Sequence, residues 1–295
     1  MKVETNSIKA WMLAVRPKTL TGAAVPVMIG CALSAAHGGF DVRVAVLCFL
    51  FAFMMQIDAN LINDLFDFLK GADRDDRLGP ERACAQGWIT KDAMQKGIVL
   101  TTIVAALTGL GLLFFGGPEL IVIGAACILF AFLYTAGPYP LAYHGWGDVL
   151  VLVFFGFVPV GSIYYIMMHD WSLSTGLLSL ACGMVIETLL VVNNFRDRAQ
   201  DAASGKKTLI VRLGAKAGIR MYLLSGLIAS LCCLYFIGKG HLWAALLPQI
   251  YLLSHIRTTV RMARIYEGKA LNIILGETSR NMLLFGILLS LGLIL

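Results

Sequence analysis

The chain has 295 residues, of which 58% are hydrophobic and 14% charged, with a formal net charge of +6 at pH 7. Soluble domains are typically about 45–50% apolar and about 25% charged. This composition, together with apolar runs of roughly 20 residues, the length of helix that crosses a bilayer, excludes a secreted scaffold, a nucleic-acid-binding domain and a disordered tail. The sequence predicts a polytopic membrane protein with no nucleic-acid partner.

Hydropathy divides the chain into nine apolar segments. All should be helices, because a backbone exposed to lipid must satisfy its own hydrogen bonds. The predicted fold class is therefore all-α: a single domain over residues 1–295, with nine transmembrane helices around a central cavity and a cytoplasmic cap of loops. The predicted spans, in chain order, are 20–37, 43–69, 95–116, 119–136, 147–168, 173–196, 219–238, 241–257 and 280–295.

The basic residues predict the orientation of these spans. In the nine-span arrangement all of the 24 lysines and arginines except Arg43 and Lys239 fall on one side. Because cytoplasmic loops carry the excess of Lys and Arg, we expect a cytoplasmic N-terminus and an outer C-terminus in the cell (inner) membrane. The positive charge on this face also favours anionic lipid head groups or an anionic substrate.

Acidic and amide side chains gather at the predicted cytoplasmic end of the second span. They recur at intervals of three and four residues, so they share one face of a helix. The same arrangement returns at the end of the sixth span, which suggests two duplicated halves over about 20–145 and 146–257. The first cluster contains Asn60, Asn63, Asp64 and Asp67, and the second Asn193, Asn194, Asp197 and Asp201.

Grouped carboxylates near a bilayer need a compensating interaction. Their desolvation costs on the order of a few kcal/mol each, and a solvated helix end could account for one cluster but less readily for two. We therefore expect the two clusters to face each other across a cavity and to bind Mg²⁺, which prefers oxygen ligands and commonly bridges carboxylates to phosphate oxygens. Neighbouring cations such as Arg196 and Lys206 suit a diphosphate.

At these residues the sequence resembles the UbiA superfamily of intramembrane aromatic prenyltransferases. Within it, the chain is most similar to the 1,4-dihydroxy-2-naphthoate polyprenyltransferases of menaquinone synthesis. The resemblance covers nearly the whole chain. It is carried by Arg16-Pro17-Lys18-Thr19-Leu20, Asn63-Asp64-Leu-Phe-Asp67, Lys70-Gly71-Ala-Asp73, Asp76-Arg77-Leu-Gly79-Pro80, Tyr134-Thr135-Ala-Gly137-Pro138, Gly147-Asp148, Asn194-Phe-Arg196-Asp197, Gly205-Lys206-Lys207-Thr208-Leu209 and Arg212-Leu-Gly214.

The resemblance implies Mg²⁺-dependent transfer of a polyprenyl group from polyprenyl diphosphate to 1,4-dihydroxy-2-naphthoate. The carboxyl group would leave as CO₂, and the products would be demethylmenaquinone and diphosphate. The first motif of the superfamily often ends on a further Asp where this chain has Gly71, so Asp64 or Asp73 is expected to take that place.

The resemblance also implies roles for individual residues. Asp67, Asp197 and Asp201 are expected to be catalytic, and they form the metal site together with Asp64 and Asp73. A further set is expected to bind the two substrates, the polyprenyl diphosphate and the aromatic acid. It consists of Asn63, Asn193, Arg196, Lys206, Arg77, Tyr139, Arg16 and Lys18.

Alternatives stay open at this point. Glu187, about three turns before Asp197, could assist deprotonation of the ring or could be a protonated, hydrogen-bonded side chain. The acceptor could be another aromatic acid, such as 4-hydroxybenzoate. A secondary transporter would also contain duplicated halves and intramembrane acids, although its site tends to lie near the bilayer midplane.

Overall fold

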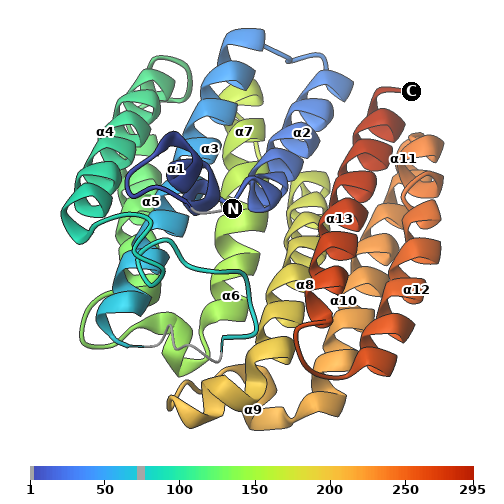
Figure 1. Ribbon diagram of the computed structural model, residues 1–295. Helices are drawn as coiled ribbons and strands as arrows, with labels where there is room; N and C mark the ends of the chain where they lie inside the picture. Colours follow the sequence, from blue (N-terminus) through green and yellow to red (C-terminus); the bar gives the residue numbers. More distant parts are fainter. Residues whose placement is uncertain (1–2, 72–76) are drawn as a thin grey trace.

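The computed structural model describes residues 3–71 and 77–295, and these residues form a bundle of helices (Figure 1). Helices with capping side chains begin where the sequence supplies Ser, Thr or Asp: Ser7, Asp41, Thr90 and Ser172 each accept a backbone N–H in the first turn. The helices are α1 (Ile8–Val15), α2 (Leu20–Ala36), α3 (Val42–Leu69), α4 (Lys91–Gly116), α5 (Leu120–Thr135), α6 (Gly147–Val151), α7 (Val158–Met168), α8 (Leu173–Ala203), α9 (Leu209–Leu213), α10 (Ala215–Leu234), α11 (Leu242–Leu246), α12 (Gln249–Ile265) and α13 (Leu271–Ile294).

The all-α class is confirmed, but the count of nine spans is wrong. Within the described ranges, seven helical stretches are long and apolar enough to cross a membrane. The predicted span 119–136 corresponds to α5, which has only 16 residues. The predicted span 241–257 is interrupted after α11 at Pro248, and α12 carries Arg257, Arg261 and Arg264. The last helix begins at Leu271, about two and a half turns earlier than predicted.

The helices pack in two neighbouring groups that meet at α2 and α8. In Figure 1, α3, α4 and α5 lie on one side of α2 and α7, while α10, α12 and α13 lie on the other side of α8. Fully buried side chains such as Val185, Tyr251 and Phe285 fill the core between α8, α12 and α13. This core packs α8 against α12 and α13, and α8 carries the second carboxylate cluster.

The helical stretch that runs from α6 to α7 is irregular at its centre. Residues Leu152–Phe157 form a π-helical segment between α6 and α7, and Pro159 follows it. Such segments bulge the helix and are frequent at functional sites. Gly156 fits here because a Cβ on it would lie 2.5 Å from the Ser179 carbonyl oxygen, so the bulge packs directly against α8.

A short folded segment over residues 77–90 joins α3 to α4. Both carboxylate oxygens of Asp64 in α3 hold it, since Oδ2 accepts the Ala83 N–H at 3.0 Å and Oδ1 accepts the Cys84 N–H at 2.9 Å. The N-terminal segment adds a second attachment, because the Asn6 N–H donates to the Trp88 carbonyl at 2.7 Å. These bonds place the segment against the end of α3.

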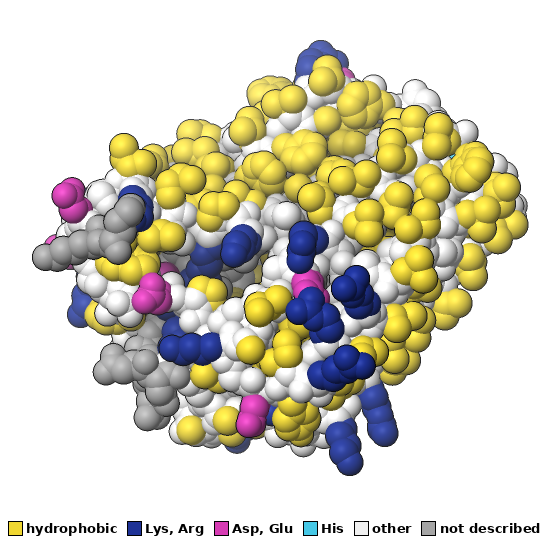
Figure 2. Space-filling view, turned by 45° about the vertical axis from the view of Figure 1, so that its right-hand side comes forward, with side chains coloured by type: hydrophobic (Ala, Val, Ile, Leu, Met, Phe, Trp, Pro, Cys, Tyr) yellow, Lys and Arg dark blue, Asp and Glu magenta, His cyan; other side chains and the backbone are white. Residues whose placement is uncertain are grey.

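Figure 2 shows that apolar side chains cover most of one broad part of the surface, as expected for a face in contact with lipid. Lysines and arginines gather instead around a hollow at the other end of the molecule. Six of the basic residues line the cavity described next: Arg16, Lys18, Arg77, Arg82, Arg196 and Lys206.

Candidate functional site

A cavity of about 1180 Å³ runs between α2, α3, α4, α5, α8 and the start of α13. Its walls change character along its length. The described residues that line one part are polar or charged, and those that line the other part are apolar. The polar part includes Asn63, Asp67, Arg77, Arg82, Tyr143, Asn193, Arg196, Asp197, Asp201 and Lys206, and the apolar part includes Met55, Leu110, Leu113, Ile123, Gly124, Phe130 and Phe154.

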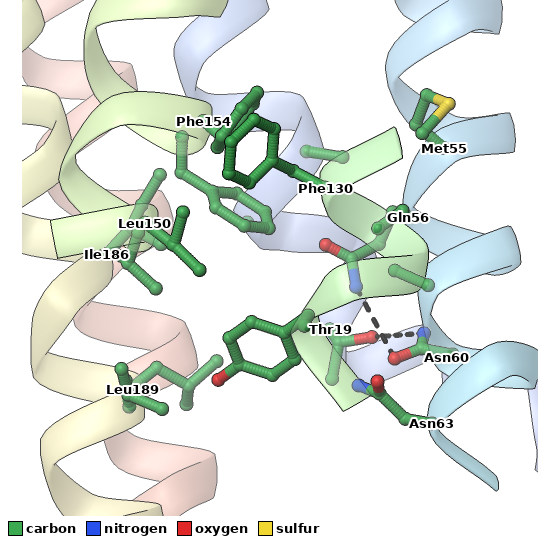
Figure 3. A pocket seen from close by; sticks show the side chains of 18 of the residues that line it. Thr19, Met55, Gln56, Asn60, Asn63, Phe130, Leu150, Phe154, Ile186 and Leu189 are labelled. Carbon is green, nitrogen blue, oxygen red and sulfur yellow. Dashed lines mark hydrogen bonds between the residues drawn. The ribbon is translucent and has the colours of Figure 1, made fainter. Parts of the chain in front are cut away.

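Figure 3 shows where the two parts meet. The rings of Phe130 and Phe154 lie with their centroids 5.1 Å apart and close one side of the apolar part. On α3, Asn60 donates to the Thr19 hydroxyl at 2.9 Å, and Gln56 donates to Asn60 at 3.4 Å. The amides therefore mark the transition from hydrocarbon walls to polar walls.

Asp67 is the carboxylate that α3 presents to the cavity. Its Oδ2 lies 3.3 Å from the Arg82 guanidinium, and its Oδ1 accepts the Tyr143 hydroxyl at 3.1 Å. Lys70 lies next to it and donates to the Thr135 carbonyl. Burial lowers the pKa of the Lys70 ammonium, and the negative charge of Asp67 opposes this shift. Of these two cations, Arg82 lines the cavity, whereas Lys70 lies at a separate small pocket beside Tyr143.

The second cluster comes from the end of α8. Asp197 is paired with the neighbouring Arg196, whose Nη2 lies 2.6 Å from Oδ2 and whose Nη1 donates to the Asn272 side chain at 2.9 Å. Asp201 Oδ1 lies 3.5 Å from the Lys206 ammonium. Its other oxygen is buried and has no hydrogen-bond partner among the described residues. This buried oxygen has the capacity to accept a hydrogen bond or to bind a cation.

The residues at this end of the cavity fit Mg²⁺ in ligand type. Asp67, Asp197 and Asp201 supply hard oxygen ligands to one cavity, and Asp201 Oδ2 needs a partner. Over residues 3–71 and 77–295, however, no three carboxyl, histidine or cysteine groups lie close enough together to hold a metal ion. Arginine and lysine side chains balance these carboxylates instead.

Asp64 does not face the cavity, which corrects the expectation that it is a metal ligand. It is 1% exposed, and its two oxygens already accept the backbone N–H groups of Ala83 and Cys84. Arg16, expected to bind substrate, lines the cavity but lies 3.5 Å from Asp64. Asp73, the other residue expected to replace the acid that is missing at Gly71, lies outside the described residues.

Tyr139, which the sequence analysis expected to bind substrate, also lies elsewhere. It is 55% exposed, stacks on His144 and does not line the cavity. Tyr134 and Tyr143, on either side of it in sequence, line the cavity instead. The short 3-10 turn Leu141–His144 turns Tyr143 toward α3.

The remaining predicted residues lie at the cavity. Lys18, Asn63, Arg77, Asn193, Arg196 and Lys206 all line it. Asn63 accepts the Thr135 hydroxyl at 2.8 Å, and Arg77 Nε donates to the Pro80 carbonyl at 3.0 Å. Sequence reasoning missed the roles of Tyr143 and Asn272, because neither belongs to a periodic cluster and both reach the site from distant segments.

Known proteins resemble this chain over most of its length. The model of the UbiA prenyltransferase family matches residues 23–290. The chain is 35% identical to the 1,4-dihydroxy-2-naphthoate octaprenyltransferase of Escherichia coli (strain K12), covering 99% of this chain and 97% of that protein. It is 37% identical to the protein of the same name from Mycobacterium tuberculosis, over 78% of each chain.

Two solved structures share this fold. The apo structure of a UbiA homologue from Aeropyrum pernix K1 has a TM-score of 0.70 at 15% identity, covering 95% of this chain and 98% of that chain. A UbiA homologue from Archaeoglobus fulgidus, bound to GPP and Mg²⁺, has a TM-score of 0.65 at 15% identity over 97% and 99%. The family match, the full-length relatives and the shared fold show that this multi-pass membrane protein belongs to the UbiA prenyltransferase family.

Proposed function

We propose that the protein transfers a polyprenyl group from polyprenyl diphosphate to 1,4-dihydroxy-2-naphthoate, with loss of CO₂. The observation that carries this proposal is the shape of the cavity, in which an apolar channel ends between two carboxylate motifs and several cations. An amphiphile with a hydrocarbon tail and a polyanionic diphosphate head matches both parts. The two relatives named above bear the name of this activity.

The polar end suits the diphosphate head. Arg196, Arg77 and Lys206 line it and can donate charge-assisted hydrogen bonds to phosphate oxygens. Asp67, Asp197 and Asp201 would hold Mg²⁺, which supplies positive charge where negative charge develops on the leaving diphosphate. Asn63 and Asn193, on the same walls, can orient the head through their amides.

The apolar end suits the prenyl tail and the reactive carbon. Its walls of Met55, Leu113, Phe130 and Phe154 keep water away from the allylic carbon once its C–O bond breaks. The electron-rich naphthoate ring then supplies the electron pair for the new C–C bond. Arg16 and Lys18 line the cavity and are candidates to pair with the carboxylate of the acceptor.

The proposed orientation in the membrane rests on the distribution of the basic residues. We place the motif end of the bundle, the N-terminus and the active site in the cytoplasm and the C-terminus outside, in the cell (inner) membrane. The clustering of Lys and Arg around the hollow in Figure 2 supports this placement.

The test is turnover by the purified protein in detergent with Mg²⁺, a polyprenyl diphosphate and 1,4-dihydroxy-2-naphthoate, with CO₂ and diphosphate measured together. We expect equal release of both, abolished by EDTA and restored by added Mg²⁺. If diphosphate is released with 4-hydroxybenzoate but not with 1,4-dihydroxy-2-naphthoate, the proposed acceptor is wrong and the proposed prenyl transfer stands. No release with any aromatic acid would overturn the proposed function.

A further inference from the structure

Four arginines gather on an outer face of α12 and α13. On α12, Arg257, Arg261 and Arg264 recur at intervals of four and three residues, so they lie on one stripe of the helix. Arg280 belongs to α13. The side chains of Arg257, Arg264 and Arg280 are exposed and that of Arg261 is 42% exposed. None of these four residues lines the cavity described above.

Contacts between the two helices bring these arginines together. Arg261 is paired with Glu277 of α13, and Asn281 of α13 donates to the Thr258 hydroxyl at 3.0 Å, so the two helices lie side by side and run antiparallel. Arg280 follows Glu277 by three residues, which places the two side chains next to each other on the surface of α13. We call the resulting group the arginine patch, and it consists of Arg257, Arg261, Arg264 and Arg280.

The protein itself balances little of the charge of the arginine patch. Among the residues that the structure describes, Glu277 is the one acid within salt-bridge distance of the patch. Arg257, Arg264 and Arg280 form no ion pair with any described residue. Four guanidiniums and one carboxylate leave a net charge of +3 on this face. A charged side chain beside hydrocarbon is costly without a counter-ion, so the patch favours an anionic partner from outside the chain.

Arg280 lies well inside a helix that is long and apolar enough to cross a membrane. It follows the first residue of α13, Leu271, by nine residues, or about 13 Å, and precedes the last, Ile294, by 14 residues, or about 21 Å. The hydrocarbon core of a bilayer is about 30 Å thick. A guanidinium at this height reaches the head-group level of the nearer leaflet by extending its aliphatic stem along the helix.

Beyond the arginine patch the same side of each helix becomes apolar. On α12, Ile250 and Leu253 lie seven and four residues before the first arginine and are 50% and 75% exposed. On α13, Ile287 and Leu291 lie seven and eleven residues after the arginine of that helix and are 39% and 49% exposed. Residues at such intervals share one side of a helix. Figure 2 likewise shows Lys and Arg side chains grouped beside a broad apolar surface.

We propose that this face binds an anionic phospholipid of the membrane. The phosphate of the lipid lies on the arginine patch, and its acyl chains run along the exposed isoleucine and leucine side chains of α12 and α13. Arginine suits this role because its planar guanidinium donates two parallel hydrogen bonds to phosphate oxygens. The apolar stretch distinguishes a lipid from a free phosphate, which has no hydrocarbon to place there. This site is separate from the reaction proposed above.

The lipid would contact a helix that also forms part of the cavity wall. Asn272, Leu275 and Ser279 of α13 line the cavity from another side of the helix. A ligand that binds the folded protein and not the unfolded chain stabilises the folded state in proportion to the logarithm of its concentration. Binding of the lipid should therefore raise the Tm of the whole protein.

The test titrates the purified protein in detergent with phosphatidylglycerol or with phosphatidylcholine of the same acyl chains. The rise in Tm gives the dissociation constant of each lipid, and native mass spectrometry counts the bound lipid molecules. We expect phosphatidylglycerol to bind about 30-fold more tightly than phosphatidylcholine, and Arg257→Gln/Arg280→Gln to lose about tenfold of this preference. The control Lys91→Gln/Lys96→Gln removes two exposed cations from α4 and should keep the preference.

Other results would overturn the proposal. These are equal affinity of the wild type for the two lipids, and an equal loss of preference in both double variants. If inorganic phosphate raises the Tm as strongly as phosphatidylglycerol, the patch binds a free anion and not a lipid. If Arg257→Gln/Arg280→Gln changes the oligomeric mass and not the number of bound lipids, the face contacts a second copy of the chain. If this double variant does not fold, the two substitutions are titrated singly, and an unchanged preference in both contradicts the lipid site.

Discussion

The hydroxyl of Tyr143 donates a hydrogen bond to Asp67 Oδ1 at 3.1 Å, and this bond joins the turn after α5 to the end of α3. Arg82 approaches the other oxygen of Asp67 at 3.3 Å. The carboxylate is therefore oriented from two sides before any substrate binds. Such preorganised groups cost little reorganisation during reaction.

Tyr143→Phe should lower kcat/KM for the prenyl diphosphate by about tenfold, the equivalent of about 1.4 kcal/mol, because Asp67 loses one of its two orienting partners. Steady-state kinetics in detergent measure the effect. Tyr139→Phe is the matched control, since that exposed ring does not line the cavity. Equal effects of the two substitutions would show that the Tyr143–Asp67 bond is irrelevant to activity.

Asp67→Asn, Asp197→Asn and Asp201→Asn should each reduce kcat by about 10²–10³-fold, the range seen when one electrostatic contact to a transition state is removed. The half-saturating concentration of Mg²⁺ should rise in the same variants. Asp92→Asn, an exposed acid in the first turn of α4, should leave both quantities unchanged. Wild-type activity in any of the three variants would remove that residue from the metal site.

Asp64→Ala should lower the stability of the folded protein. Loss of its carboxylate leaves the N–H groups of Ala83 and Cys84 without acceptors in a buried place, which costs about 1–3 kcal/mol. Thermal unfolding in detergent should show a lower Tm for Asp64→Ala than for the control Glu81→Ala, an exposed change in the same segment. An unchanged Tm with abolished Mg²⁺ dependence would instead return Asp64 to the metal site.

Sequence periodicity predicted most of the carboxylate site but not its orientation. Asp64 and Asp67 are three residues apart, which separates them by about 60° around a helix of 3.6 residues per turn. That difference is enough to turn Asp67 into the cavity and Asp64 toward the loop segment. Hydrophobic patterning cannot distinguish these directions, because they depend on which segment packs on each flank.

The contacts from distant segments could not be predicted from one sequence. Tyr143 and Asn272 reach the clusters through tertiary packing, and Tyr139 was the more obvious candidate because it follows the predicted span directly. The helices themselves were predicted well where the apolar run is continuous, as in α2 and α3. The prediction failed where Pro248 and the arginines of α12 interrupt the pattern.

Gly124→Leu should shift the preference of the enzyme toward donors with a shorter prenyl chain. Gly124 lines the apolar part of the cavity, and a Cβ added there meets no atom within 4 Å, so the new side chain fills space that a long tail uses. We expect kcat/KM for an octaprenyl donor to fall about tenfold relative to a geranyl donor, the equivalent of about 1.4 kcal/mol, because the leucine occupies open space that only the longer tail reaches.

The control for this change is Gly176→Leu. Gly176 also lies in a helix, and a Cβ added there also meets no atom within 4 Å, but it does not line the cavity. It should leave the ratio of the two donors unchanged. A constant ratio in Gly124→Leu as well would mean that the tail takes another route through the bundle.

Arg196 connects α8 to two other segments at the polar end of the cavity. It pairs with Asp197, donates to Asn272 of α13, and Asn272 in turn donates to the Leu78 carbonyl at 2.8 Å. The segment that precedes α4 is therefore attached to the last helix of the chain next to a guanidinium that also lines the cavity. A substitution of Arg196 removes a cation from the cavity and a tertiary contact at the same time, so a loss of activity in such a variant must be compared with its Tm before it is assigned to substrate binding.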